Sequence, residues 1–558
     1  MNTFFMSPGR SPKIAVAVLG FHFLFFFILN LFIHPHPDML DHWVWSRFLA
    51  WSYYEHPPMV AWVFRTITLL GGNHEMSLEV GSQIYNLLIC VLAYGISVRL
   101  FGTTAGLMTL LLLCSTLYFT LGSIFLHIDQ AYLIFWLINL YFLVRYHQTQ
   151  KIRWLMGIGV IAGLGALSKY ITLLFYMGMG IHFLLYKPLR RQWLNPWLYV
   201  AGLVSLIIFT PVLWWNYQNH WVSFLFQFKR GLSGAPLGQN AIFFTLGHLM
   251  LFSPVWSWWC FQNLWKKRSM FANGSSPESV IIVVSSFPLI FFTMMSFRGD
   301  IADPHWVNVS YLGFMILAGK ILAESVATAK TRWMLALGIV FNLLLIGVAI
   351  LHVFHPLGDV MQYKLENYTW LQRKGVPENV QQELKTMKAR YYGAEPFFKE
   401  LQSRLSDEDF QRYSPLIQRA AMRTLSDPVA PMLGWPETAN AIVELLKKNQ
   451  LPMPRYVISK EYQLGGALSF YLPDFPWPHS LEKPERNQWS LDEDVLNNNS
   501  IFVCDLPKCE RAREHFAQKF TAPLQYLGDV VTESNHRVVR TLEVYSVGQD
   551  SIQRESGF

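Results

Sequence analysis

Long apolar runs recur between residues 14 and 354 of this 558-residue chain, and no other feature restricts its fold as strongly. A helix needs roughly 20 apolar residues to cross about 30 Å of hydrocarbon. The composition agrees, since 52% of the residues are hydrophobic and only 15% are charged, whereas soluble proteins carry about 25% charged residues. Eleven runs, several of them short, are candidate membrane spans: 14–33, 80–98, 105–122, 130–144, 154–168, 170–186, 197–214, 241–264, 279–297, 306–319 and 333–354. The sequence therefore predicts a polytopic α-helical membrane protein.

Basic residues predict which side of the membrane each loop occupies. With the N-terminus placed inside, every inside segment carries Lys or Arg, as the positive-inside rule requires. An odd number of spans then puts residues 356–558 outside. The net charge of +8 resides mostly in the short inside loops, so we predict no nucleic-acid binding from it.

Residues 356–558 have the composition of a soluble domain, which divides the chain into a transmembrane domain, 1–355, and an extracytoplasmic domain, 356–558. Apolar residues at helical spacing predict a helix over 437–449. Strand-like runs are predicted at 455–459, 500–504 and 538–547. The tail is thus expected to be a small α/β domain, in which Cys504 and Cys509 either form a disulfide or stay as free thiols.

The loop after the first span places two carboxylates, Asp38 and Asp41, beside the membrane surface. A carboxylate there costs little to keep charged, and it can reach a lipid-borne substrate. One interpretation is that Asp38 caps a short helix over 39–51. The neighbouring aromatic residues, Trp43 and Tyr54 among them, are typical of a membrane interface and favour chemistry on lipid-linked substrates.

A second acid, Asp129, lies at the outer end of the fourth predicted span, where it either caps that helix or joins the first-loop acids on the outer face. Lys169 stands alone in an otherwise apolar stretch. A buried lysine without a partner is expensive, so it needs a substrate phosphate or an outer carboxylate. Arg298 and Arg230, which follow apolar segments on the same face, are further candidates for anion binding.

Histidines near the first-loop acids raise the question of a metal. His34, His36 and His56 match no metal-binding spacing. We therefore predict that no cofactor is required, and a divalent metal stays as the less favoured alternative.

The order of these motifs resembles a known family. Asp38 to Ser46 and then Tyr53 to Trp62 follow the pattern Asp-Glu-Ala-Tyr-Tyr-Trp-x-Trp-Ser…Tyr-Phe-Asp-His-Pro-Pro-x-x-Ala-Trp. Further matches come in order along the chain: the Asp129 loop, Leu167–Tyr170, Pro211–Asn216, Trp221–Phe224 and Phe470–Pro473. The pattern resembles bacterial glycosyltransferases of the GT-C fold that use polyprenyl-phosphate-linked sugars, related to protein O-mannosyltransferases and lipid A aminoarabinose transferases.

The resemblance implies transfer of a sugar from a polyprenyl phosphate to a cell-envelope acceptor, which is lipid A, another glycolipid or a protein. It also implies a bacterial inner membrane, with the N-terminus cytoplasmic, the site and tail periplasmic, and membrane lipids as surroundings. It places the catalytic acid on Asp38 and the second loop acid on Asp129. Two departures stand out: Met39 replaces the usual Glu, for which Asp41 is a candidate substitute, and His56 stands where aminoarabinose transferases have Lys.

The predicted site therefore has three groups of residues. The candidate catalytic acids are Asp38, Asp129 and Asp41. The candidates for donor-phosphate binding, where positive charge must meet developing phosphate charge, are Lys169, Arg298 and Arg230. The candidates for substrate contacts are His56, Tyr54, Trp43 and His305.

Two other functions compete with this hypothesis. A transporter or flippase of lipid-linked sugars usually holds ionisable groups near the bilayer midplane, whereas here the acids collect at one face. An oligosaccharide ligase would share the donor and the membrane setting.

Overall fold

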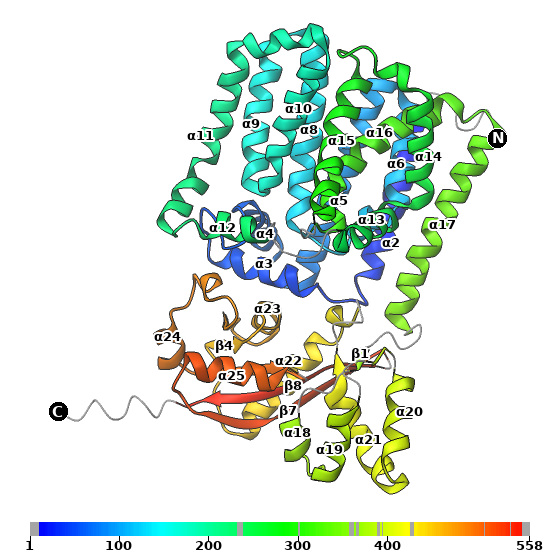
Figure 1. Ribbon diagram of the computed structural model, residues 1–558. Coiled ribbons are helices and arrows are strands. Elements are labelled where there is room, and N and C mark those ends of the chain that lie inside the picture. Colours follow the sequence, from blue (N-terminus) through cyan, green and yellow to red (C-terminus); the bar gives the residue numbers. More distant parts are fainter. Residues whose placement is uncertain are drawn as a thin grey trace. The chain divides into compact units, whose positions relative to one another are not determined.

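The computed structural model describes residues 11–230, 238–298, 302–355, 362–363, 368–387, 391–392, 394–423, 429–506, 508–535 and 537–548. The chain forms two compact units (Figure 1). The membrane unit comprises Met1–Leu31 and Leu49–Gly347, and the tail unit comprises Phe32–Phe48 and Val348–Phe558. The first-loop segment that carries Asp38 and Asp41 therefore belongs to the tail unit, although the sequence analysis grouped it with the transmembrane domain.

All the regular secondary structure in the described part of the membrane unit is helical. Its helices are α2 (Ser11–Leu29), α4 (Met59–Gly71), α5 (Glu75–Phe101), α6 (Thr103–Ser115), α7 (Leu117–Leu121), α8 (Ile128–Thr149), α9 (Ile152–Ser168), α10 (Leu173–Leu185), α11 (Pro196–Gln218), α12 (Val222–Arg230), α13 (Gln239–Phe252), α14 (Pro254–Lys266), α15 (Pro277–Phe297) and α16 (Asn308–Ser325), and α17 (Ala329–Phe354) crosses into the tail unit. Short 3-10 turns lie at η1 (Tyr170–Thr172) and η4 (Pro304–Val307).

The number of spans differs from the sequence prediction. By length and composition, seven described helices are able to cross a membrane, or eight when the bent pair α13 and α14 counts as one span. Helices α6 and α9 fall short of the required length, as does the segment Tyr170–Leu185. All eleven predicted runs coincide with helical sequence, but they do not yield eleven full-length spans. Apolarity alone does not reveal where a helix breaks, as between α13 and α14, which meet at 92°.

Small residues let the helices of the membrane unit approach closely. Helix α9 packs against α8 and α11 (Figure 1). A Cβ atom added at Gly159 would lie 2.5 Å from the carbonyl oxygen of Ala201 on α11. Since lipid tails are as apolar as leucine, association inside a membrane depends on such close packing, and a larger residue at Gly159 would force α9 and α11 apart.

The tail unit contains a five-stranded sheet in the order β5-β4-β6-β8-β7. Its strands are β4 (Tyr456–Ser459), β5 (Trp477–Ser480), β6 (Ser500–Asp505), β7 (Leu524–Ser534) and β8 (Arg537–Val547). Strand β4 is parallel to β5 and β6, and β8 is antiparallel to β6 and β7. The three predicted strands are therefore confirmed as β4, β6 and β8, and the sequence analysis missed β5 and β7.

Helices and a second, smaller sheet complete the tail unit. The helices are α3 (Pro37–Arg47), α18 (Tyr368–Arg373), α19 (Glu378–Thr386), α20 (Ala394–Arg404), α21 (Asp407–Ala421), α22 (Trp435–Lys448), α23 (Tyr462–Tyr471), α24 (Asp492–Asn497) and α25 (Cys509–Lys519). The second sheet joins β1 (Gln362–Tyr363) to β2 (Tyr391–Tyr392) and β3 (Met422–Arg423). The predicted helix over 437–449 is confirmed as α22, and the predicted α/β character of the tail is confirmed with it.

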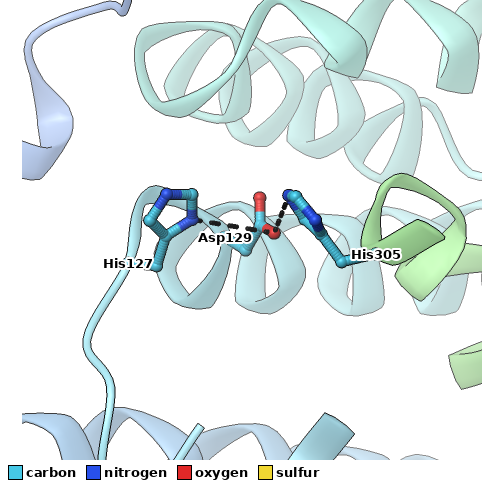
Figure 2. Close-up of side chains that lie close together, drawn as sticks. All are labelled: His127, Asp129 and His305. Atoms are coloured by element: carbon cyan, nitrogen blue, oxygen red, sulfur yellow. Dashed lines mark ion pairs between the residues drawn. The ribbon is translucent and has the colours of Figure 1, made fainter. Parts of the chain in front are cut away.

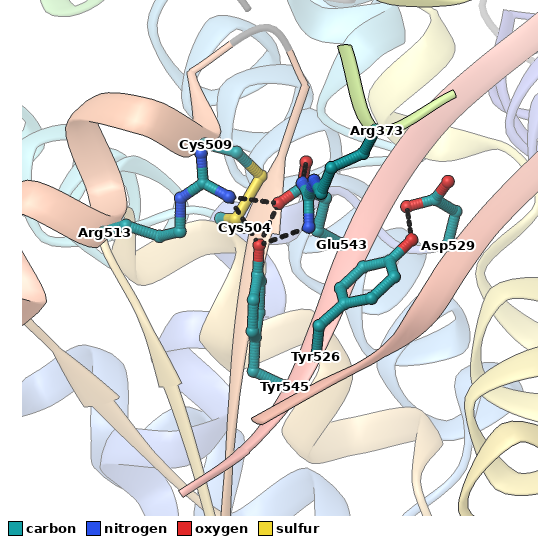
Figure 3. The surroundings of a disulfide bond; sticks show 8 residues. All are labelled: Arg373, Cys504, Cys509, Arg513, Tyr526, Asp529, Glu543 and Tyr545. Atoms are coloured by element: carbon teal, nitrogen blue, oxygen red, sulfur yellow. Dashed lines mark hydrogen bonds and ion pairs between the residues drawn. A yellow bond between two sulfur atoms is a disulfide. The ribbon is translucent and has the colours of Figure 1, made fainter. Parts of the chain in front are cut away.

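A disulfide and a buried carboxylate hold the sheet to its covering helices (Figure 3). Cys504 on β6 is bonded to Cys509 at the start of α25, which decides the alternative left open by the sequence. Glu543 on β8 is fully buried and forms ion pairs with Arg373 and Arg513. Tyr545 donates a further hydrogen bond to the same carboxylate. A buried charge is tolerated when it is paired and hydrogen-bonded in this way.

Candidate functional site

Asp129 is the centre of a buried polar cluster in the membrane unit. Its side chain lies at the start of α8, and only 2% of the residue is exposed. Lys169 Nζ lies 2.5 Å from Asp129 Oδ1, and this lysine is only 6% exposed. Of the two partners that the sequence allowed for this lysine, a phosphate or a carboxylate, the structure places the carboxylate beside it.

The second carboxylate oxygen of Asp129 has partners of its own. Asn308 Nδ2 donates to Oδ2 at 3.1 Å, and the Tyr118 hydroxyl donates to it at 3.3 Å. Asn308 also donates to the Tyr118 hydroxyl at 2.7 Å. Residues from α7, α8, α16 and the break after α9 thus converge on one carboxylate, whose charge is well compensated.

Local structure explains how these side chains reach the cluster. Lys169 follows the last residue of α9 with an extended backbone, φ −155° and ψ 134°, before the 3-10 turn η1. The break in the helix turns its side chain towards Asp129. At the start of α8, the His127 backbone N–H donates to Gln130 Oε1 at 2.7 Å, which closes the first turn. Asp129 lies in that turn, where the helix dipole favours a negative charge.

Two histidines flank the carboxylate. His305 Nε2 lies 3.7 Å from Asp129 Oδ2, and His127 Nδ1 lies 3.9 Å from the same atom. Figure 2 shows the two imidazole rings directed at Asp129 from either side. Asp129, Lys169 and His305, all predicted from the sequence, therefore meet in one place, and His127 joins them.

The first-loop acids lie in the tail unit, on α3. His36, and not Asp38, is the N-cap of α3, because His36 Nδ1 accepts a hydrogen bond from the Asp38 backbone N–H at 3.2 Å. The capping interpretation of Asp38 is therefore wrong. Its side chain is 31% exposed and lies 3.6 Å from His36 Nδ1.

Asp41, one turn further along α3, is buried. Its Oδ2 atom lies 2.8 Å from Arg486 Nη2, and the two side chains are 5% and 3% exposed. The Arg486 guanidinium also lies 3.4 Å from the centre of the Tyr462 ring. This geometry assigns Asp41 to anchoring α3 within the tail unit.

Helix α23 completes the support of α3. A Cβ atom at Gly466 would lie 3.2 Å from the Asp41 Cα, so a larger residue would push the two helices apart by a few tenths of an ångström. At the other end of α3, the Arg47 guanidinium lies 3.9 Å from the Trp477 ring and donates to Ser469 Oγ at 3.2 Å. Trp43 is fully buried against Phe470. The structure thus places Trp43 in the packing of the tail unit and not on an open surface, as substrate contact would require.

The remaining predicted residues lie outside the Asp129 cluster as far as the described side chains show. Arg298 is exposed just after α15. Arg230 ends α12, and its side chain lies outside the described part of the chain. His56 is half-buried, and its carbonyl accepts from the Tyr53 N–H at 3.0 Å. The Tyr54 ring packs 4.9 Å from that of Phe226.

Sequence reasoning missed four residues of these clusters: His127, Tyr118, Asn308 and Arg486. His127 carried a signal, because it lies two residues before a candidate acid. Tyr118 and Asn308 are neutral residues near helix ends, which no charge pattern reveals. Arg486 pairs with a carboxylate 445 positions away, and nothing local in the sequence indicates that contact.

Comparisons with known proteins add to this geometry. Residues 55–215 match the family described as dolichyl-phosphate-mannose-protein mannosyltransferase. Lipid A galacturonosyltransferase RgtD of Rhizobium johnstonii is 25% identical over 343 residues, which cover 59% of this chain and 67% of that protein.

Solved structures show the same fold. ArnT from Cupriavidus metallidurans bound to undecaprenyl phosphate matches with a TM-score of 0.60 and 17% identity, over 96% of this chain and 97% of the other. The apo state of that protein matches with a TM-score of 0.58 and 16% identity, over 97% of both chains. The predicted architecture, a helical membrane part followed by a small sheet domain, is thereby confirmed.

Proposed function

We propose that this chain is a membrane glycosyltransferase of the GT-C type that transfers a sugar from a polyprenyl phosphate to lipid A. The family model matched by residues 55–215, the similarity to RgtD and the fold shared with ArnT support this proposal. The donor class follows the undecaprenyl phosphate bound to ArnT, and the acceptor follows the lipid A acted on by RgtD. The chain is a multi-pass membrane protein. We place it in the bacterial inner membrane, with a cytoplasmic N-terminus and a periplasmic tail.

The buried pair of Lys169 and Asp129 is the observation that carries this proposal. Ionisable residues inside a membrane protein are rare and usually mark a substrate site. The pair lies where α8 begins and α9 ends, and we place the lipid phosphate there. A phosphate leaving group gains negative charge as the sugar departs, so the site must supply positive charge there. Lys169, oriented by Asp129, supplies it, and Arg298 is a second candidate.

The acceptor needs a group that receives its proton. Asp38 suits this role, because its carboxylate is partly exposed on α3 and its neighbour is a histidine. A base has to lie within hydrogen-bond reach of the hydroxyl that it deprotonates. One displacement at the anomeric carbon inverts its configuration. Where the accepting group is itself a phosphate, Asp38 positions it and needs to remove no proton.

A transfer assay tests the proposal. The full chain, purified in detergent or reconstituted in liposomes, is supplied with synthetic polyprenyl phosphates that carry galacturonic acid, aminoarabinose or mannose. Lipid A and membrane proteins are the acceptors. The matched control is Glu75→Gln, which changes an acid at the start of α5. The proposal is supported if sugar is transferred to lipid A, if Asp38→Asn abolishes this transfer and if Glu75→Gln leaves it intact. Transfer only to protein would refute the acceptor, and full activity of Asp38→Asn would refute the role of Asp38.

A further inference from the structure

The tail unit contains a cavity that the sugar transfer described above does not use. Its volume is about 240 Å³, whereas one buried water needs roughly 10–15 Å³. The cavity is lined by the start of α3, the start of α23, strand β8 and the loop after β6, including His36, Leu464, Asp505, Lys508, Arg540 and Leu542. Pockets for drug-sized ligands measure about 300–1,000 Å³, so this cavity suits a smaller molecule such as a single sugar unit.

Arg540 on β8 brings a buried positive charge to this cavity. The residue is 5% exposed, and its guanidinium lies 3.6 Å from the centre of the Trp435 ring. It donates to Thr438 Oγ1 at 2.9 Å and to the Ala430 carbonyl oxygen at 3.5 Å, and both acceptors are neutral. These bonds use two of the five N–H donors of a guanidinium. In the described part of the chain, no carboxylate forms an ion pair with Arg540.

The charge of Arg540 persists at neutral pH. Burial lowers the pKa of its guanidinium from 12.5 to about 10, and the nearby charge of Asp505 opposes this shift. A buried charge is costly unless it is paired and hydrogen-bonded. An anion in the cavity would supply that pairing, because the planar fork of arginine matches the oxygens of a carboxylate or a phosphate.

The other charged groups of the cavity favour an anion that also carries hydroxyl groups. Lys508 Nζ lies 3.2 Å from Glu461 Oε1, so these two charges compensate each other. Asp505 adds a carboxylate, whose oxygens accept hydrogen bonds from hydroxyl groups. The disulfide between Cys504 and Cys509 closes the short loop that carries both Asp505 and Lys508. An acidic sugar or a sugar phosphate offers an anionic group for the guanidinium and hydroxyl groups for the carboxylate.

The start of α3 gives the cavity a second link to negative charge. His36, the N-cap residue, and Pro37, the first residue of α3, both line it. The dipole of a helix favours negative charge near its N-terminus. His36 Nδ1 accepts a hydrogen bond from the Asp38 backbone N–H. A molecule in the cavity would therefore contact the cap of the helix that carries Asp38.

We propose that this cavity binds a hydroxylated anion, an acidic or phosphorylated sugar, whose carboxylate or phosphate pairs with Arg540. Its occupant holds the start of α3 in place. The same chemistry occurs in free sugars and in the headgroups of glycolipids, and competition between the two distinguishes them. The anion site does not depend on the proposed function.

Calorimetric titration of the full chain in detergent tests the site, with galacturonate and glucose 1-phosphate as probes and galactose as the neutral control. We expect both anions to bind and galactose to bind at least about tenfold more weakly. Arg540→Gln should weaken binding of the anions by about 10- to 100-fold, the usual effect of losing a hydrogen bond to a charged group. Arg540→Lys keeps the charge without the planar fork and should lose part of the affinity.

Arg455→Gln is the matched control, since Arg455 is an exposed arginine of the same unit. It should bind the anions like the unaltered protein, and thermal unfolding should show that all three variants are folded. Equal binding of galactose would overturn the anionic character of the site. Failure of every anion to bind, or binding that Arg540→Gln leaves unchanged, would overturn the site itself.

Hydrogen–deuterium exchange shows whether the occupant reaches α3. With the anion at ten times its Kd, exchange in residues 37–47 should slow by up to about tenfold, and Arg540→Gln should remove this protection. Unchanged exchange would overturn the link to α3. Displacement of the bound anion by lipid A in mixed micelles identifies a lipid headgroup as the occupant, and its absence identifies a free sugar. None of these readouts measures sugar transfer, so a failure of the proposed function would be recognised separately.

Discussion

Replacing Arg486 by methionine should loosen α3, the helix that carries Asp38. The change removes the cation that lies 2.8 Å from Asp41 Oδ2 and leaves a carboxylate whose side chain is 5% exposed. Removing one partner of a buried ion pair costs about 3–5 kcal/mol. Methionine keeps much of the apolar contact with Tyr462, so the missing charge accounts for most of this cost.

Hydrogen–deuterium exchange of the full chain in detergent measures the effect where it arises. A loss of about 3 kcal/mol in the local opening of α3 speeds amide exchange in residues 37–47 by roughly 150-fold, at 1.4 kcal/mol per tenfold. Arg455→Met is the matched control, because Arg455 is an exposed arginine of the same unit and lies 5.9 Å from the Tyr456 ring. It should leave exchange in α3 unchanged.

A double-variant cycle separates the ion pair from general damage. Asp41→Asn and Arg486→Met together remove both charges and leave neither one buried without its partner. We therefore expect the double variant to lose much less stability in α3 than the sum of the two single losses. If Arg486→Met changes exchange in α3 by less than threefold, or if the two single losses simply add, Arg486 does not anchor α3 through Asp41.

Three further predictions follow from the other clusters. Lys169→Met should lower sugar transfer by about 10²–10³-fold, the usual cost of losing one donor to developing charge; near-normal turnover in the transfer assay would contradict its role. Gly466→Val should destabilise the tail unit, because the new Cβ would lie 3.2 Å from the Asp41 Cα; unchanged thermal unfolding of the full chain would contradict that close approach. Burial, and then the nearby Lys519, lower the pKa of His479 from 6.5 to about 4. The unfolded chain therefore takes up a proton first as the pH falls, so the tail unit keeps its full stability above pH 6.5 and loses about 3 kcal/mol by pH 4. His479→Gln should flatten this pH dependence in thermal unfolding, and an equal slope in the variant would refute it.

Hydropathy predicted where helices lie but not how many of them cross the membrane. The run 241–264 is continuously apolar, yet the chain bends by 92° at Ser253, which has a φ of +77° and precedes a proline. The short helices α6 and α9 are equally apolar and still too short. Hydropathy registers transfer from water to an apolar medium, whereas the ends of a helix depend on local backbone geometry.

The cost of burying charge predicted more of the site than any motif did. Lys169 was expected to need a partner because it interrupts an apolar stretch, and the structure supplies Asp129. That argument extends only to charged residues. Asn308 and Tyr118 complete the shell of Asp129 through neutral hydrogen bonds, and long-range packing decides such contacts.

The three candidate catalytic acids differ in what surrounds them, and this difference separates their roles. Asp129 is engaged by Lys169 and by two hydrogen-bond donors, and Asp41 is engaged by Arg486. A carboxylate tied to a buried cation is a poor acceptor for a substrate proton, because protonation would break the ion pair. Asp38 is the more exposed acid, and His36 Nδ1 lies 3.6 Å from its carboxylate. Asp38→Asn should therefore abolish transfer and leave exchange in α3 unchanged, whereas Asp41→Asn should act through the stability of α3. If both variants lost activity only in proportion to the loosening of α3, Asp38 too would be structural, and the base would have to be sought elsewhere.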